Sequence, residues 1–347
     1  MISAILILSF LIFFHELGHF LMARLVGVKV EVFSIGFGKK LICKKIGQTD
    51  WCISAIPLGG YVQMKGQDDS NPTLKNNDPD SYTSKSPLQR VLILLGGPGF
   101  NFLLAFLIYF FLAVFGWQKL APVVGKTIPD TPAAKVLKSG DRIFEINGKK
   151  IKSWDDISKI VQVSDELNLK VIRDRKIIML SLRPKTKKQK NIFKEEIKRK
   201  IIGIIPKGDT VTIKYSLSEA LKIASEELIK ASTMIVKSIQ KLITGAIGLN
   251  TLSGPIGIVD VTAKVANFGI QPLLLLTALL SVNLGVLNLL PIPALDGGHI
   301  IFNLYEWISK KEINEEIMYK LTLAGWALLG SLMIIGIYND LHRLIGG

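Results

Sequence analysis

The chain has 347 residues, of which 49% are hydrophobic, and carries a formal net charge of +15 at pH 7. Its mean hydropathy of +0.37 is high for a soluble protein, so we predict a membrane protein with a soluble portion. The lysines are spread over several segments and no nucleic-acid-binding motif stands out. The composition therefore favours the lipid bilayer as a partner and argues against nucleic acid.

The first apolar segment, from about Ile2 to Met22, contains the sequence His-Glu-Leu-Gly-His at residues 15–19. Residues four apart share one face of a helix, so His15 and His19 can reach the same metal ion. Glu16 lies beside them, where a carboxylate can deprotonate a metal-bound water. The alternative is a polar patch satisfied by neighbouring helices. Ionisable side chains are costly in lipid, which favours a functional site.

Three further segments are long and apolar enough to cross a bilayer, which requires roughly 20 residues. They are Val91 to Trp117, Ile270 to Leu295, and Met318 to Tyr338. The connection from Arg24 to Arg90 carries ten Lys or Arg, whereas none precedes the first span. The positive-inside rule therefore places this connection in the cytoplasm and the N-terminus outside, with the segment between spans two and three also outside.

The predicted cytoplasmic connection has two parts. Residues 28–64 alternate branched and polar side chains, which indicates β-strands, and Leu41–Ile46 with Trp51–Ile56 form a hairpin around residues 47–50. Residues 67–89 are polar and contain three prolines, so we expect a flexible linker. Cys43 and Cys52 flank the hairpin turn, where a bridge is geometrically possible, but a cytoplasmic location predicts that they are reduced.

A soluble domain is predicted at residues 121–206. Its sequence Ile-Pro-Asp-Thr-Pro-Ala-Ala at 128–134, Ser-Gly-Asp-Arg-Ile at 139–143 and Ile-Asn-Gly at 146–148 resembles a circularly permuted bacterial PDZ domain. That resemblance implies binding of extended peptides, including peptide C-termini, by strand addition. The basic segment 183–200 is interpreted as a solvated loop, with contact to lipid headgroups as the alternative.

The expected fold is a polytopic α-helical membrane protein with about four transmembrane helices, a cytoplasmic-side β-hairpin region and one external α+β domain. Its four parts are residues 1–120 (spans one and two), 121–206 (the external domain), 214–250 and 251–347 (spans three and four). Residues 214–250 are predicted to form an amphipathic helix. This helix either lies on the outer membrane surface or packs on the external domain.

A hydrolytic zinc site takes three protein ligands and a water molecule, so a third ligand is needed. Asp296 follows the third span, where Pro291 and Pro293 prevent a regular helix. Unwound backbone at membrane depth is tolerated only inside protein or beside a wet cavity, which suits a metal-binding carboxylate. His299 is the alternative ligand, and ligand chemistry alone favours Asp296 only slightly.

With its Leu-Asp-Gly motif at 295–297 and its PDZ-like domain, the chain resembles the site-2 protease family of intramembrane zinc metalloproteases, and within it the bacterial regulator-of-sigma-E protease type. The remaining matching motifs span nearly the whole chain in the same order. They are Gly36-Phe37-Gly38, Pro57-Leu58-Gly59-Gly60-Tyr61-Val62, Gly96-Gly97-Pro98 with Asn101, Ser253-Gly254-Pro255-Ile256-Gly257, and Ser281-Val282-Asn283-Leu284-Gly285. The well-known members have two tandem PDZ domains, whereas this chain has one.

The resemblance implies that His15, His19 and Asp296 bind Zn²⁺ and that Glu16 is the general base. It also implies that Asn288, and less strongly Asn283, holds the substrate backbone. Both asparagines could instead bind carbonyl groups freed by the prolines.

The expected substrates are transmembrane segments of single-span membrane proteins, such as anti-sigma factors or remnant signal peptides. The resemblance implies a bacterial inner membrane location, an external PDZ domain and an active site towards the cytoplasm. The hairpin should offer a strand edge to the unwound substrate, with Gly59 and Gly60 permitting close backbone approach. Two alternatives are a membrane-anchored zinc peptidase that cuts extended peptides at the membrane surface and a non-enzymatic PDZ scaffold.

Overall fold

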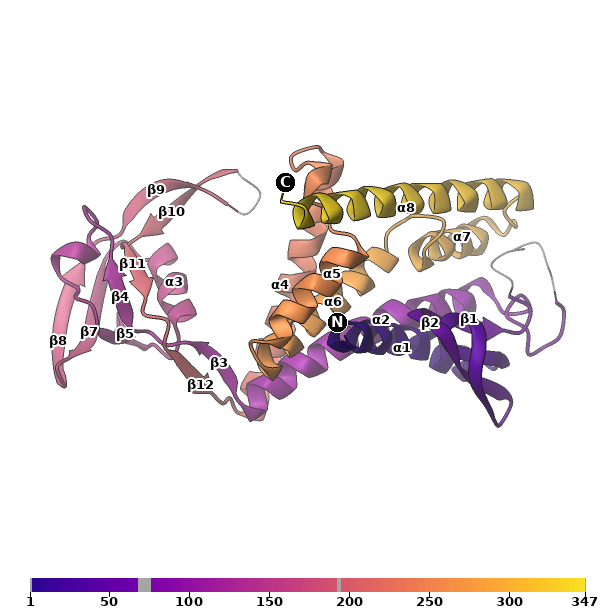
Figure 1. The fold of residues 1–347 in the computed structure, drawn as a ribbon, viewed down its shortest axis with the longest axis horizontal. Coiled ribbons are helices and arrows are strands. Elements are labelled where there is room, and N and C mark those ends of the chain that lie inside the picture. The colour runs from indigo at the N-terminus through magenta and orange to yellow at the C-terminus, as the bar shows by residue number, and fades with distance from the viewer. Residues whose placement is uncertain (1, 68–75, 192–194, 347) are drawn as a thin grey trace. The chain divides into compact units, whose positions relative to one another are not determined.

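The chain folds into two compact units, seen in a computed structural model that describes residues 2–67, 76–191 and 195–346 (Figure 1). The helical unit comprises Met1–Phe110 and Lys222–Gly347, and the β-rich unit comprises Phe111–Leu221. Each unit gathers segments that are far apart in sequence around its own buried residues.

Four helices of the described chain are long and apolar enough to cross a membrane, in agreement with the prediction. They are α1 (Ile2–Leu25), α2 (Pro87–Phe115), α6 (Ile270–Asn288) and α8 (Glu315–Leu344). The third ends at Asn288 rather than Leu295, because the prolines that follow cannot continue a helix. Two shorter helices were not predicted: α5 (Pro255–Ala266), which begins with proline, and α7 (Asp296–Ser309).

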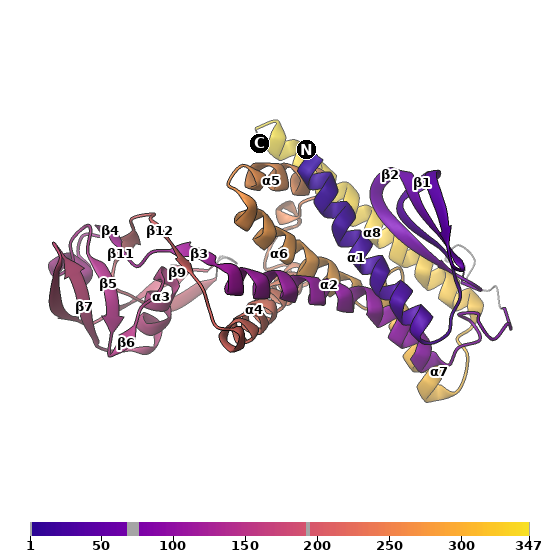
Figure 2. The same cartoon turned by 90° about the horizontal axis from the view of Figure 1, so that it is seen from below.

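The predicted hairpin is formed by β1 (Val30–Ile46) and β2 (Thr49–Met64), which lie beside α1 (Figure 2). Both strands bend, so that residues 40–46 pair with 49–54 while residues 30–35 pair with 60–64. Residues 50–53 also pair with 32–35 and therefore have neighbours on both sides. Residues 50–53 thus lie inside the sheet, and its outer segments, which could offer the expected strand edge, are 40–46 and 60–64.

The two cysteines are joined by a disulfide bond, contrary to the expectation that they are reduced. Cys43 and Cys52 are direct partners in the antiparallel register, with Cα atoms 4.2 Å apart. The register explains this pairing, because it brings the two side chains to the same place on the same face of the hairpin.

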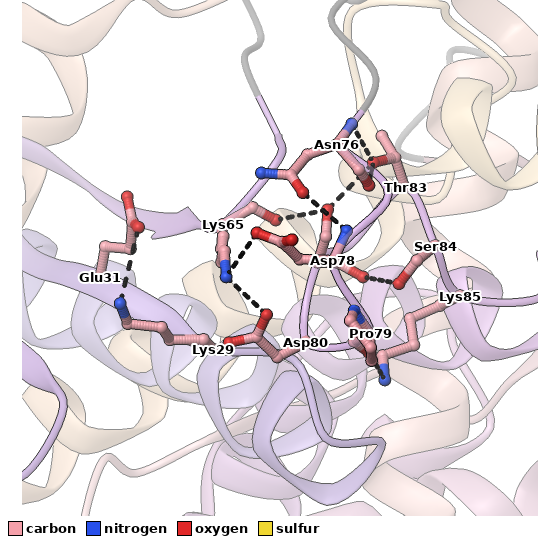
Figure 3. Close-up of polar contacts among 11 residues, drawn as sticks. Lys29, Glu31, Lys65, Asn76, Asp78, Pro79, Asp80, Thr83, Ser84 and Lys85 are labelled. Carbon is pink, nitrogen blue, oxygen red and sulfur yellow. Dashed lines mark hydrogen bonds and ion pairs between the residues drawn. The ribbon is translucent and has the colours of Figure 1, made fainter.

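The connection from β2 to α2 is held to the hairpin by Lys65 (Figure 3). The Lys65 ammonium lies 2.9 Å from Asp78 Oδ2 and 2.6 Å from Asp80 Oδ1. The backbone carbonyl of Lys65 accepts a hydrogen bond from Tyr82 N, and Lys29 N donates to the Asp80 carbonyl. Residues 76–86 are therefore anchored, and α2 begins at Pro87. The prediction of a flexible linker over 67–89 is wrong for residues 76–89. Residues 68–75 of it lie outside the described residues.

The β-rich unit is built on a four-stranded antiparallel sheet in the order β6–β5–β7–β8. These strands are β5 (Arg142–Ile146), β6 (Lys149–Lys150), β7 (Leu167–Arg173) and β8 (Lys176–Leu182). Leu167, Leu169 and Val171 alternate with more exposed residues along β7 and enter the core, as the period of a strand requires. The same unit contains the helix α3 (Trp154–Val163), whose start is fixed by Asp156 accepting a hydrogen bond from Ser153 N.

Three two-stranded pairs complete this unit and extend it beyond the predicted 121–206. They are β3 (Trp117–Leu120) with β12 (Thr210–Ile213), β4 (Val124–Thr127) with β11 (Ile204–Pro206), and β9 (Lys185–Lys190) with β10 (Glu196–Ile201). The last pair, which we call the basic ribbon, replaces the loop expected at 183–200. The predicted amphipathic helix is α4 (Leu217–Ile243), and from Lys222 onward it belongs to the helical unit, so it does not pack only on the β-rich unit.

A buried ion pair joins β7 to the loop before β5. Asp141 is fully buried, and Arg173 donates to both its carboxylate oxygens at 2.7 Å. Burial raises the pKa of Asp141, but the hydrogen bonds from Arg173 and from Lys138 N outweigh it and hold this pKa below its ordinary value of 3.8. The pair is therefore stabilising at neutral pH, and this contribution is lost only as the pH falls through the lowered pKa.

Replacing Asp141 with asparagine should destabilise the β-rich unit by about 3 kcal/mol, because it leaves the Arg173 guanidinium largely buried without its counter-charge. The free energy of unfolding is measured by urea-dependent pulse proteolysis of the full chain. Asp174→Asn, an exposed change of the same kind on the adjacent turn, serves as the control and should change stability by less than about 0.5 kcal/mol. Equal effects of the two substitutions would contradict the role of the ion pair.

Candidate metal centre

Three side chains that could bind one metal ion converge inside the helical unit. His15 and His19 come from α1 and Asp296 from the first position of α7, and their ligand atoms all lie within 4.8 Å of one another. The Nε2 atoms of the two histidines are 3.2 Å apart. Asp296 Oδ2 lies 3.4 Å from Nε2 of His15, and Oδ1 lies 3.5 Å from Nε2 of His19.

These separations match a tetrahedral zinc site. Ligand atoms about 2.0–2.2 Å from zinc and at tetrahedral angles are about 3.3–3.5 Å apart. Both histidine residues are less than a tenth exposed, and the Asp296 Oδ2 atom is buried without a hydrogen-bond donor among the described residues. A cation between the three side chains would satisfy this carboxylate oxygen, so the residues present fit the metal.

The local sequence determines how each of the three ligand side chains is positioned at the centre. The spacing of four residues places both imidazoles on one face of α1. After α6 the chain is non-helical until Leu295, through Pro291 and Pro293, and α7 then begins with Asp296. Gly297 lies against the carbonyls of residues 289 and 290, so a larger residue there would push the start of α7 away from the site.

The second nitrogen of each imidazole also has a partner. His19 Nδ1 donates to the Ile93 carbonyl of α2 at 2.9 Å, which leaves its Nε2 unprotonated and able to bind a metal. Asn101 of α2 is fully buried, and its Nδ2 lies 2.9 Å from His15 Nδ1. The Asn101 backbone carbonyl accepts from Ser281 Oγ of α6 at 2.8 Å. Asn101 therefore connects the helix of the histidines to α6, a role that the sequence analysis did not assign.

Glycines let α1 and α2 approach at the centre. A Cβ atom at Gly96 would meet the Gly18 carbonyl, and one at Gly18 would meet the Gly96 carbonyl. A Cβ atom at Gly97 would overlap Nε2 of His19 and come within 2.7 Å of Cε1 of His15. The close contact of these helices, which small residues permit, thus places α2 directly against the two imidazoles.

The other predicted site residues are distributed as follows. The Asn288 Nδ2 atom lies 3.3 Å from His15 Nε2, so Asn288 reaches the centre. Asn283 is five residues earlier on α6, about 140° around the helix, and the described residues show no hydrogen bond from its side chain to the centre. His299, the alternative ligand, is not in the cluster and instead lines a separate cavity of about 510 Å³.

The sheet of the hairpin reaches Glu16. A Cβ atom at Gly60 would lie 3.3 Å from Glu16 Cγ and 2.8 Å from the Ser34 carbonyl, so β2 runs against α1 at this position. Gly59 has φ +138° and lies under the Phe37 ring, where a side chain would not fit. Both glycines therefore permit close contacts with α1 and β1 of the chain itself, and the close approach of a substrate backbone at these positions stays a prediction.

Comparison with known proteins identifies the family. The model for peptidase family M50 matches residues 3–332. The chain belongs to this family, the site-2 proteases. The "Putative zinc metalloprotease Cj1068" of Campylobacter jejuni is 45% identical over 99% of this chain and 94% of its own length. A "Putative zinc metalloprotease" of Helicobacter pylori is 44% identical, and "Zinc metalloprotease RasP" of Bacillus licheniformis 31%, each over 99% of both chains.

This member of family M50 is accordingly a zinc metalloprotease and a membrane protein. Among solved structures, the PDZ domain of the SdrC-like protein of Listeria monocytogenes matches 24% of this chain and 84% of its own length, with 23% identity and a TM-score of 0.21.

Gly97→Ala should weaken zinc binding at least about tenfold, because the added methyl group displaces both imidazoles. Zinc retained after dialysis against a chelator is measured by mass spectrometry on the purified protein. Gly99→Ala is the matched control on the same helix, since a Cβ atom there meets nothing within 4 Å. If the Gly97 variant keeps as much zinc as the Gly99 variant, the claim that glycine at position 97 leaves room for the two imidazoles is wrong.

Proposed function

We propose that the chain is an intramembrane endopeptidase that cuts transmembrane segments of single-span membrane proteins. The observation that carries this proposal is the position of the candidate metal centre. It is formed by α1, by the start of α7 and by neighbouring helices α2 and α6, three of which are long enough to span a bilayer. A peptide bond that reaches it must come from within the apolar part of the bilayer, which suits a membrane-embedded substrate.

In this proposal His15, His19 and Asp296 hold the zinc and Glu16 is the general base. Zinc supplies a Lewis acid that lowers the pKa of a bound water and polarises the scissile carbonyl. Glu16, next to His15 in the chain and beside Gly60, accepts the proton of the attacking water and passes it to the leaving amine. The buried surroundings exclude bulk water and hold these groups in place before the substrate arrives.

The substrate helix must unwind before its backbone can reach the centre. The outer segment of the sheet, residues 60–64, is placed to receive it, since Gly60 lies at Glu16 and residues 30–35 occupy the inner side. Strand pairing there would satisfy the backbone groups that unwinding exposes in lipid. Asn288, 3.3 Å from His15, is placed to hold a substrate carbonyl beside the metal, whereas Asn283 is the weaker candidate.

The β-rich unit would act as a PDZ domain on the external side of the bacterial inner membrane, and would bind peptide C-termini. Its permuted PDZ motifs coincide with observed elements: the Asn-Gly turn at 147–148 has positive φ at both residues and links β5 to β6. The residues between Arg24 and Arg90 would then face the cytoplasm, as the positive-inside rule requires, and in that reducing compartment the bond between Cys43 and Cys52 would be open. Substrates trimmed outside the membrane, such as anti-sigma factors or remnant signal peptides, fit this arrangement.

We further assign Asn101 the role of orienting His15. Among the described residues the buried Asn101 Oδ1 atom has no hydrogen-bond partner, while the Nδ2 atom of the same amide faces His15 Nδ1. Turning the amide by half a revolution would place Oδ1 on the protonated Nδ1 of His15. The oxygen then gains a donor, and His15 Nε2 is left with a free lone pair for the metal, as His19 already has through Ile93.

Asn101→Leu should therefore release zinc about 10- to 100-fold faster, because His15 loses the acceptor that fixes its ring. Asn101→Asp keeps an acceptor of the same shape and should retain zinc nearly as the parent does. The rate of zinc transfer to a coloured chelator is the measurement, and it requires no activity. A leucine variant that holds zinc as tightly as the aspartate variant would refute the role of Asn101.

The proposed function is tested with a membrane-embedded single-span reporter, cleaved by the parent, Glu16→Gln and Asp296→Asn proteins, with zinc measured on each. The parent should cut within the span. Glu16→Gln should keep its zinc but lose cleavage by at least about a thousandfold, and Asp296→Asn should lose zinc.

Two results would contradict this assignment. Cleavage by Glu16→Gln would remove Glu16 as the base. Cleavage of extended soluble peptides, with the embedded reporter left intact, would indicate a peptidase that acts at the membrane surface.

A further inference from the structure

The β-rich unit contains a cavity of about 230 Å³ between α3 and the basic ribbon. Its apolar side comes from Trp154, Ile157 and Val161 of α3 and from Ile202. The opposite side is polar and comes from the ribbon, with Gln189 of β9 and Arg199 of β10. The cavity therefore offers an apolar surface and a cationic surface to the same occupant.

The edge of β10 that faces α3 carries backbone groups already bonded to a side-chain amide. Gln162 Nε2 donates to the Lys200 carbonyl at 2.7 Å, and Lys200 N donates to Gln162 Oε1 at 3.3 Å. The N–H and C=O groups of one strand residue point to the same side, so this is the edge that β9 does not occupy. A side-chain amide offers the same donor and acceptor as a peptide group. Gln162 thus occupies the position that a peptide group of an added strand would take.

The ribbon carries opposed like charges beside the cavity. Lys187 of β9 is the direct cross-strand partner of Arg199 of β10, and both side chains are exposed. Neither makes an ion pair with the described residues. Like charges directly opposite each other destabilise a strand pair, so ribbon stability does not explain this arrangement. An anionic occupant of the adjacent cavity would neutralise it.

We propose that the groove between α3 and β10 binds an extended acidic peptide that adds as a strand to β10 after displacing Gln162. Its carboxylate side chains meet Arg199 and Lys187, while alternate apolar side chains enter the cavity against Ile157 and Val161. The partner is thus a protein segment outside the membrane in which acidic and apolar residues alternate. This inference rests on the proposed peptide-binding role of the β-rich unit and adds its charge selectivity and the residue that gates it.

Binding is measured on the full chain carrying Glu16→Gln, in neutral phosphatidylcholine nanodiscs, by anisotropy of a labelled ten-residue peptide. One peptide alternates aspartate with valine, and the other has asparagine at each aspartate. The acidic peptide should bind at least fivefold more tightly. Arg199→Glu and Lys187→Glu should each weaken binding about two- to fivefold, and added salt should weaken it further.

Lys176→Glu on β8 is the matched control, with the same charge change at an exposed position of the same unit. It should leave the Kd unchanged. Gln162→Met keeps the length of the side chain but removes the amide, and should tighten binding severalfold because nothing then competes for Lys200. Thermal unfolding of each variant shows that the β-rich unit is intact.

Hydrogen exchange identifies what covers the ribbon. Slower exchange of the amides of residues 198–201 with the acidic peptide supports strand addition. Equal binding of the two peptides, a Lys176→Glu effect as large as that of Arg199→Glu, or weaker binding by Gln162→Met would overturn the proposal.

Protection that appears only in phosphatidylglycerol nanodiscs would make the ribbon a membrane contact instead. The binding experiment uses the Glu16→Gln protein, in which cleavage is suppressed, so a negative result concerns only the peptide groove. Failure of the proposed protease function would appear instead in the cleavage assay with the membrane-embedded reporter.

Discussion

Polar groups within apolar helices must satisfy one another, because lipid offers no hydrogen-bonding partner. This constraint organises the helical unit. His15 and His19 use one nitrogen each for the neighbouring helix α2 and turn the other towards Asp296. The same helix α2 bonds to α6 through Ser281 and Asn101. The candidate centre is therefore a set of mutually dependent contacts, and Gly18, Gly96 and Gly97 provide the close helix approach on which those contacts rely.

The hairpin extends this constraint to backbone groups. Its strands bend so that residues 50–53 are paired on both sides, while the segment 60–64 is left at the outside with Gly60 against Glu16. A sheet in this position brings backbone donors and acceptors next to the candidate base. In the proposed function, an unwinding substrate helix would exchange its internal hydrogen bonds for strand pairing at this place.

In its proposed role, the β-rich unit has to keep a stable core and also offer a strand edge for binding. Its core is closed by alternating apolar residues of the central strands and by the buried Asp141–Arg173 pair. Gln162 spans the groove beside α3, and its hydrogen bonds to Lys200 could be exchanged for those of a peptide. A side chain that occupies a strand edge also protects that edge from unwanted pairing.

The sequence by itself determined the features that depend on local periodicity. The four-residue spacing of His15 and His19, the presence of four long apolar helices and the hairpin turn after Ile46 all follow from neighbours in the chain. The prolines after α6 likewise predicted a break before Asp296, although not the short helix that follows it.

Only the tertiary structure decided what depends on contacts between distant segments. It brought Asp296 rather than His299 to the histidines about 280 residues earlier, placed Asn101 on His15, and paired Cys43 with Cys52 through the bent register. It also placed residues 60–64 at the outer edge of the sheet and showed that the basic segment forms a ribbon beside α3. The helical and strand periods specify on which face of its own helix or strand a residue lies. The packing of whole elements specifies which other element that face contacts.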